Sequence, residues 1–316
     1  MALTLDIISI GECMVEFFCE GGLGEAELFR KAYGGDTLNT LVAAARLGSR
    51  TGYITRVGRD PFARFLLSSW EREGIDITHA PLMEGFNGIY FISLVAGGGR
   101  EFTYYRKGSA ASTLDPRELD RGYISGARIL HSSGITQALS RNNREYVLDA
   151  FKTAREAGVK VSYDTNLRTK LWDLEAARAG LEEVLAYVDI FLPSAEELEV
   201  LLGLEGREAV AEHFSDLVEV VAVKEGMEGA TVIYKGEVRH IPPLDVEVVD
   251  TTGAGDAFNG GFLHAIASGL DPFKAAEMGV VTAGLKVRGR GAVASLPRKG
   301  EVEAHLRGST TSRAPL

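Results

Sequence analysis

The chain has 316 residues, of which 45% are hydrophobic and 25% charged, and its formal net charge is −10. This length and composition suit one large domain with an accessory piece better than two equal domains. The acidic balance argues against binding to nucleic acid, which needs clustered Lys and Arg, although a few convergent basic groups can still hold a small anion.

The N-terminal segment and the cysteines bear on location. The first ten residues lack a basic region and include an acidic residue, so we interpret them as a strand and not as a signal peptide. No apolar run approaches the roughly 18 residues that a membrane helix needs. Cys13 and Cys19 have no metal-binding spacing, and we expect reduced thiols. We therefore predict a cytoplasmic protein that binds neither membrane nor nucleic acid.

Short apolar runs alternate with helical patterns along most of the chain. We predict strands buried on both faces at residues 5–10, 52–57, 128–131, 159–163, 189–192 and 218–223. We predict helices at residues 36–47, 142–157, 174–187 and 194–202, the first two of which end before a glycine. This alternation indicates an α/β fold with a doubly wound, mostly parallel sheet flanked by helices.

Two stretches break this rhythm. Residues 12–33 and 86–108 alternate like half-exposed antiparallel strands, and the second contains a glycine-rich turn from Gly97 to Arg100. We expect them to form a small β lid over one end of the main domain. Its exposed strand edges suggest a homo-oligomer. The pattern of residues 231–240 predicts a hairpin. We expect residues 1–300 to form a single domain and residues 301–316 to form a partly disordered tail.

The strongest signal is the glycine-rich turn from Asp250 to Asp256, which precedes a helical run. Gly253 and Gly255, with Ala254 between them, allow close approach of a ligand, and the amides that open a helix favour an anion. In phosphoryl transfer such donors stabilise charge, while a carboxylate accepts the proton of the attacking hydroxyl. We predict Asp256 as the catalytic base; a plain helix start with an acidic residue is the alternative.

This turn and a second motif carry a family resemblance. The turn Asp-Thr-Thr-Gly-Ala-Gly-Asp, and the string from Tyr33-Gly-Gly to Gly48 followed by Val57-Gly-Arg-Asp60, resemble the two signatures of the ribokinase-like, or PfkB-type, carbohydrate kinases. The resemblance implies a β lid over a sugar and transfer of the γ-phosphate of ATP to a primary hydroxyl. It also implies Mg²⁺, held mainly by phosphate and water. Some relatives use a monovalent cation near the turn, which this sequence leaves open.

The implied sugar site draws on three segments. The string that begins Tyr104-Tyr-Arg106 looks like that of the 2-keto-3-deoxygluconate kinases, in which a Tyr and the Arg approach the acidic sugar. Arg168 follows the strand at 159–163, and two arginines suit a sugar acid because a guanidinium binds a carboxylate bidentately. Tight turns, half-buried strand aromatics and an exposed arginine are the structural alternatives. The predicted substrate-binding residues are Gly34, Gly35, Asp36, Asn39, Tyr90, Tyr104, Arg106 and Arg168.

The implied nucleotide site lies in the second half of the chain. The resemblance assigns nucleotide contacts to the Lys-x-Gly-x-x-Gly pattern that ends the strand at 218–223, although a plain turn explains it equally well. Ser194 stands where many relatives have the Asn of an Asn-x-x-Glu motif linked with Mg²⁺, and Glu197 is an indirect metal candidate. The predicted cofactor-binding residues are Asn166, Ser194, Lys224, Gly226 and Gly229.

These residues predict an ATP-dependent kinase for a small sugar or sugar acid, with 2-keto-3-deoxygluconate as the first choice of substrate. A fructokinase or another PfkB-type sugar kinase is the alternative within the class. A non-catalytic regulator that binds a sugar or a nucleotide is the alternative outside it, since fold does not fix function. An NAD-dependent oxidoreductase is disfavoured, because no Gly-x-Gly-x-x-Gly follows the first strand.

Overall fold

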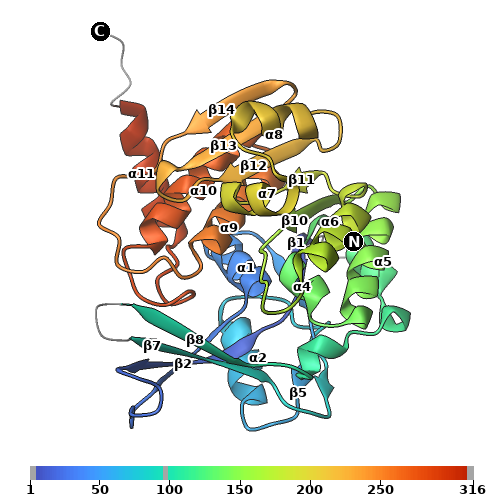
Figure 1. The fold of residues 1–316 in the computed structure, drawn as a ribbon, viewed down its shortest axis with the longest axis vertical. Helices are drawn as coiled ribbons and strands as arrows, with labels where there is room; N and C mark the ends of the chain where they lie inside the picture. The colour runs from blue at the N-terminus through green and yellow to red at the C-terminus, as the bar shows by residue number, and fades with distance from the viewer. Residues whose placement is uncertain (1–4, 95–98, 312–316) are drawn as a thin grey trace.

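The computed structural model describes residues 5–94 and 99–311, and one large β-sheet runs through it (Figure 1). Its strands are β1 Leu5–Ile10, β4 Thr51–Ile54, β9 Ala127–Ser133, β10 Lys160–Asp164, β11 Ile190–Phe191, β12 Val220–Lys224, β13 Ala230–Tyr234 and β14 Glu237–Ile241. Their order in the sheet is β14-β13-β12-β11-β10-β9-β1-β4. The pairs from β4 to β12 are parallel, and β13 and β14 are antiparallel. The predicted mostly parallel sheet is confirmed.

Helices cover both faces of this sheet, because its strands are apolar on both sides. Ile7 packs into one core and its neighbour Ile8 into the other, as the alternation of side chains along a strand requires. The first core includes residues of α1 Asp36–Leu47, α2 Ala63–Arg72, α9 Ala254–Ala267 and α10 Pro272–Lys286. The second includes residues of α3 Arg121–Ser125, α5 Arg141–Glu156, α6 Leu174–Leu185, α7 Ala195–Leu202 and α8 Arg207–Phe214. The short α4 Gly134–Ala138 follows β9 directly.

The two stretches that break the rhythm form a separate small sheet. It consists of β2 Met14–Glu20, β3 Arg30–Gly34, β7 Gly88–Leu94 and β8 Arg100–Tyr105 in the order β3-β2-β7-β8. The outer pairs are antiparallel, as predicted, but the central strands β2 and β7 run parallel because they belong to two separate hairpins. Figure 1 shows this sheet at the bottom of the molecule. Gly97 and Gly98 of the predicted turn lie outside the described residues.

Smaller elements complete the fold. The short strands β5 Val57–Gly58 and β6 Leu82–Met83 pair with each other. The predicted hairpin turn is confirmed: Lys235 and Gly236 join β13 to β14 with φ values of 50° and 76°. Among the helices of the described chain, none has the length and apolar character of a membrane span.

The C-terminal segment differs from the expected tail. Helix α11, Lys299–Thr311, occupies most of it, and residues 312–316 lie outside the described part of the chain. Val302 is buried against Leu47 and Leu285, from α1 and α10. This contact stabilises the helix through tertiary packing, which its weakly patterned sequence did not reveal.

Candidate active site

An open cleft of about 1570 Å³ is lined by residues of both sheets and by the loops that follow β1, β10 and β12. Ligand sites in parallel sheets lie at the carboxyl ends of the strands, as here. The cleft brings together nearly all the residues predicted for the site. These are Gly34, Gly35, Asp36, Asn39, Tyr90, Tyr104, Arg106, Asn166, Arg168, Ser194, Glu197, Lys224, Gly226, Gly253, Ala254, Gly255 and Asp256.

Asp256 lies in the first turn of α9, which the left-handed Gly253 caps with a φ of 77°. The Nδ2 of Asn39 donates to Asp256 Oδ2 at 2.8 Å, across a separation of 217 residues. Burial and the nearby Asp36 carboxylate together raise the pKa of Asp256 to about 7, against the hydrogen bond from Asn39, which lowers it. A carboxylate that titrates near neutral pH is matched to accept a proton at that pH.

The glycine-rich turn directs the amino end of α9 at the cleft. First-turn amides of a helix have no partner within the helix and carry its partial positive charge. The amide of Ala254 already donates to the carbonyl of Thr251 at 3.0 Å, so it is not available to a ligand. The later first-turn amides, including that of Gly255, are therefore the better donors to an anion.

A polar network joins the carboxyl ends of β10 and β12. The Nζ of Lys224 donates to Asp164 Oδ2 at 2.8 Å, and Asn259 Nδ2 donates to the same oxygen at 2.6 Å. The amide of Asn166, whose φ is 35°, donates to Asp164 Oδ1 at 3.1 Å. Asn166 Nδ2 in turn donates to Asp36 Oδ2 at 3.2 Å. Asp164 and Asn259 were missed, although Asp164 ends the strand that precedes Asn166.

The glycine pair at the end of β3 permits two close approaches. A Cβ on Gly35 would lie 2.0 Å from the carbonyl oxygen of Glu12, and one on Gly34 would lie 2.5 Å from the hydroxyl of Tyr90. Glycine is therefore required at both positions by the crowding of the surrounding groups. Asn39, one turn into α1, also accepts the Gly35 amide at 3.4 Å.

Glu12 is a site residue that the sequence analysis missed. It is buried at the end of β1, and one of its carboxylate oxygens pairs with the guanidinium of Arg106. Its Oε2 is buried without a hydrogen-bond partner among the described residues, as is Asp36 Oδ1. Burial raises the pKa of Glu12 to about 7, although Arg106 opposes the rise. The signal was an acidic residue two positions after the first buried strand.

Two arginines, Arg106 and Arg168, line the same cleft as Tyr104. The guanidinium carbon of Arg106 lies 4.9 Å from the centre of the Tyr104 ring. Burial raises the pKa of Tyr104, and the positive charges of Arg106 and Arg168 oppose that rise. Arg168 is exposed and donates to the carbonyl of Leu167 at 2.9 Å.

Glu197 has structural partners at both carboxylate oxygens. Its Oε2 accepts the amide of Ser194 at 2.9 Å, which completes a capping box on α7. Its Oε1 accepts the amide of Leu167 at 2.7 Å. Glu197 therefore fastens the loop after β10 to the start of α7, and its indirect role toward a metal stays a prediction.

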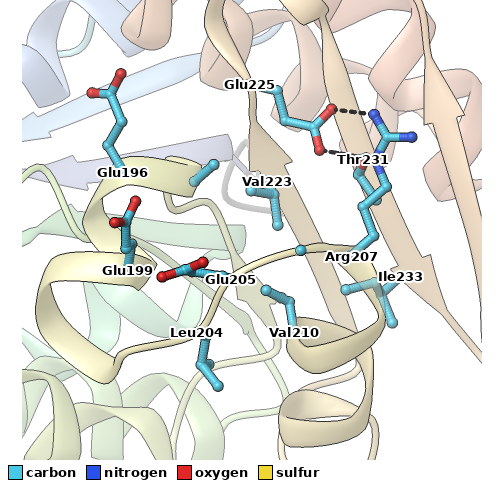
Figure 2. Close-up of a pocket in the computed structure, with 12 residues that line it drawn as sticks. Glu196, Glu199, Leu204, Glu205, Arg207, Val210, Val223, Glu225, Thr231 and Ile233 are labelled. Carbon is cyan, nitrogen blue, oxygen red and sulfur yellow. Dashed lines mark hydrogen bonds and ion pairs between the residues drawn. The ribbon is translucent and has the colours of Figure 1, made fainter.

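Glu225, in the turn after β12, is one of the residues that line a second cavity of about 400 Å³ (Figure 2). Glu225 accepts hydrogen bonds from Arg207 Nη2 at 2.9 Å and from the hydroxyl of Thr231 at 2.8 Å, which hold the turn. Gly229, a predicted nucleotide contact, is absent from the described lining of the main cleft. A Cβ there would lie 2.2 Å from the carbonyl oxygen of Ile241, so packing against β14 explains this glycine.

Comparison with known proteins identifies the family. The sequence profile described as pfkB family carbohydrate kinase matches residues 4–299. The chain belongs to this family. As a pfkB-family carbohydrate kinase it is a phosphotransferase, and the predicted sugar-kinase activity and ribokinase-like fold are confirmed.

Individual relatives differ in substrate. The 2-dehydro-3-deoxygluconokinase of Thermoproteus tenax is 35% identical over 311 residues, which cover 96% of this kinase and 94% of that protein. Fructokinase-1 of Oryza sativa subsp. japonica is 33% identical over 310 residues, covering 94% and 96%. Among solved structures, a putative ribokinase II from E. coli in complex with ATP and Mg²⁺ has a TM-score of 0.89 at 26% identity, covering 96% and 99%.

Proposed function

We propose that this kinase uses ATP and Mg²⁺ to phosphorylate a primary hydroxyl of 2-keto-3-deoxygluconate, which is also named 2-dehydro-3-deoxygluconate. The observation that carries the proposal is that two arginines, Arg106 and Arg168, line the cleft together with Tyr104. A substrate carboxylate between them would gain charge-assisted and bidentate hydrogen bonds. The similarity to the Thermoproteus tenax enzyme supports the same substrate.

Proton transfer in this proposal falls to Asp256. With a pKa of about 7, its carboxylate is largely ionised slightly above neutral pH and accepts the proton of the attacking hydroxyl. Asn39 holds one carboxylate oxygen and so orients the other. The first-turn amides of α9 and the ammonium of Lys224 then stabilise charge on the transferring phosphoryl group.

The chemistry of the cleft suits a nucleotide triphosphate with its metal. Lys224 and the amino end of α9 offer positive charge to the phosphates at one end of the cleft. In the described chain, no cluster of three or more His, Cys, Asp or Glu side chains could hold a metal ion. Mg²⁺ would therefore be held mainly by phosphate oxygens and water, where it neutralises phosphate charge.

Fructokinase activity is the second candidate, and Glu12 is the observation in its favour. The carboxylate of Glu12 already neutralises Arg106, and its Oε2 and Asp36 Oδ1 are buried acceptors without partners in the described residues. Such acceptors suit the hydroxyl groups of a neutral sugar, because an unpaired buried acceptor is costly. The 33% identity to rice fructokinase-1 supports this alternative.

A coupled ADP-release assay tests the proposal. We expect the kcat/KM for 2-keto-3-deoxygluconate to exceed that for fructose, ribose and an adenosine control. Arg168→Gln should lower kcat/KM for the sugar acid by about tenfold to a hundredfold, because a hydrogen bond between charged groups is lost, and should spare fructose. Arg117→Gln is the matched control, since the Arg117 side chain is 88% exposed and does not line the cleft. A preference for fructose, unchanged in Arg168→Gln, would refute the sugar-acid assignment.

Assembly and location stay predictions. The homo-oligomer was inferred from lid strand edges, and β3 and β8 are the edge strands of the small sheet among the described residues. Light scattering coupled to size-exclusion chromatography would measure the assembly, and cell fractionation would test the cytoplasmic location.

A further inference from the structure

A buried lysine stands beside the glycine-rich turn and has no part in the proton transfer described above. Lys286 is the last residue of α10 and has no exposed surface, although lysine is rarely buried without a partner. Its Nζ donates to the main-chain carbonyl oxygen of Asp250, the first residue of the turn, at 2.7 Å. Burial lowers the pKa of Lys286 to about 8, with the Asp250 carboxylate opposing, so the ammonium is mostly charged at neutral pH.

A second positive group reaches the same aspartate from the lid. The guanidinium of Arg100, from β8, pairs with Asp250 Oδ1 and also donates to Thr252 Oγ1 at 3.2 Å. It further donates to the carbonyl oxygen of Val249 at 3.1 Å. Arg100 therefore connects the small sheet to the turn that leads into α9.

Backbone amides also donate to both carboxylate oxygens of Asp250. Its Oδ1 also accepts the amide of Thr252 at 2.8 Å, and its Oδ2 accepts the amide of Gly291 at 2.7 Å. The pKa of Asp250 is lowered, because these hydrogen bonds and the charge of Lys286 outweigh the effect of burial. Both carboxylate oxygens and the carbonyl oxygen of Asp250 thus already have donors.

This arrangement does not fit a bound monovalent cation, which some PfkB-type kinases take near this turn. Such an ion needs several oxygen ligands, and the oxygens of Asp250 are held by N–H donors. An added ion would also be repelled by the neighbouring ammonium and guanidinium. We propose that Lys286, together with Arg100, supplies the positive charge at this turn from within the chain, and that the kinase needs no monovalent cation.

Lys286 acts in this account as a positioning residue. It fixes the carbonyl of Asp250 at one end of the turn, while Asp256 and the first-turn amides of α9 lie at the other end. The ammonium of Lys286 also interacts electrostatically with Asp256. The carboxylates of Asp250 and Asp256 both raise the pKa of Lys286, so they favour its charged form. Loss of the ammonium should therefore weaken turnover more than it weakens sugar binding.

The first experiment compares potassium chloride with tetramethylammonium chloride at matched ionic strength. Wild-type kcat should agree within about twofold in the two salts, because only general screening acts on it. Lys286→Met should lose about tenfold or more of kcat in tetramethylammonium, with KM for the sugar little changed, and potassium or ammonium ions should restore part of it. Lys274→Met, on the first turn of the same helix with a side chain 67% exposed, is the control and should behave like wild type.

A second measurement, of the melting temperature, needs no substrate and is therefore independent of the proposed function. The rate measurement depends on that function. The Tm of Lys286→Met should rise when potassium replaces tetramethylammonium, whereas the Tm of wild type and of Lys274→Met should not. Potassium activation or stabilisation of the wild-type enzyme would overturn the proposal, whether or not the variant folds. So would a folded Lys286→Met whose kcat and Tm ignore both ions. If no sugar is phosphorylated, the Tm comparison still decides between these outcomes.

Discussion

Replacing Asp256 by Asn should stop turnover and at the same time stabilise the protein at neutral and alkaline pH. The pKa of Asp256 is raised from 3.8 to about 7, mainly by burial and by the Asp36 carboxylate. Since each pKa unit corresponds to about 1.4 kcal/mol, the ionised form lowers the free energy of unfolding by at most about 4 kcal/mol. Asparagine has nearly the same shape, carries no charge, and can still accept the hydrogen bond from Asn39.

The size of this stabilising effect depends on pH. Below about pH 4 the carboxyl of Asp256 is protonated in both states and contributes no difference. Between about pH 4 and pH 7 the unfolded chain releases its proton while the folded protein keeps it, so wild-type stability falls as pH rises. The advantage of Asp256→Asn should therefore grow over this window and stay constant above it.

Urea denaturation at a series of pH values measures the stability difference, and the ADP-release assay measures kcat. We expect kcat to fall by about a hundredfold or more, as for loss of a general base. Asp216→Asn is the control, because Asp216 is exposed and lies outside the cleft lining. A stability difference that is flat with pH would refute the burial argument for Asp256. A kcat within a few-fold of wild type would refute its role as the base.

Three further outcomes follow from the cleft. Glu12→Gln should lower KM for the sugar acid about threefold to tenfold above pH 7, because the Glu12 carboxylate no longer competes with the substrate carboxylate for Arg106. An equal change in KM for fructose in initial-rate kinetics would contradict this. Gly35→Ala should lower Tm and kcat/KM, since its Cβ meets a backbone oxygen at 2.0 Å, while Gly24→Ala, in open space, should change neither. The kcat–pH profile should rise near pH 7 as Asp256 ionises and fall near pH 8 as Lys286 loses its proton. Lys286→Arg should remove the fall, and a fall that persists in this variant would exclude Lys286 as its source.

Local patterns were sufficient for much of the fold and for the phosphoryl end of the cleft. Helix α1 occupies the predicted residues, because Asp36 begins it and Gly48 ends it with a φ of 113°. The start of α9 at the glycine-rich turn was equally visible, since Gly253 and Asp256 are close in sequence. Nothing local specified the parallel pairing of β2 with β7, which depends on how two distant hairpins meet.

The missed site residues share one physical property: their partners are remote in sequence. Glu12 is 94 residues from Arg106, and Lys286 is 36 residues from Asp250. A glutamate after a strand or a lysine at the end of a helix looks ordinary until tertiary structure buries it. The crowding of Gly229 against the Ile241 carbonyl oxygen was hidden for the same reason, and its nucleotide contact stays a prediction.

The distribution of partners explains why Asp256 is suited to accept a proton. Asp164 has the ammonium of Lys224, Asp250 has the guanidinium of Arg100, and Glu12 has its own arginine, so each of these acids is paired with a cation. Among the described residues, Asp256 forms no ion pair, and its one side-chain donor is the neutral amide of Asn39. Pairing with a cation lowers the pKa of a carboxyl and burial raises it, and the buried Glu12 still has a pKa of about 7 although it is paired with Arg106. Asp256 differs from Glu12 in its position, in the first turn of α9 at the glycine-rich turn and without an arginine on its carboxylate, and this position supports its proposed role as the base.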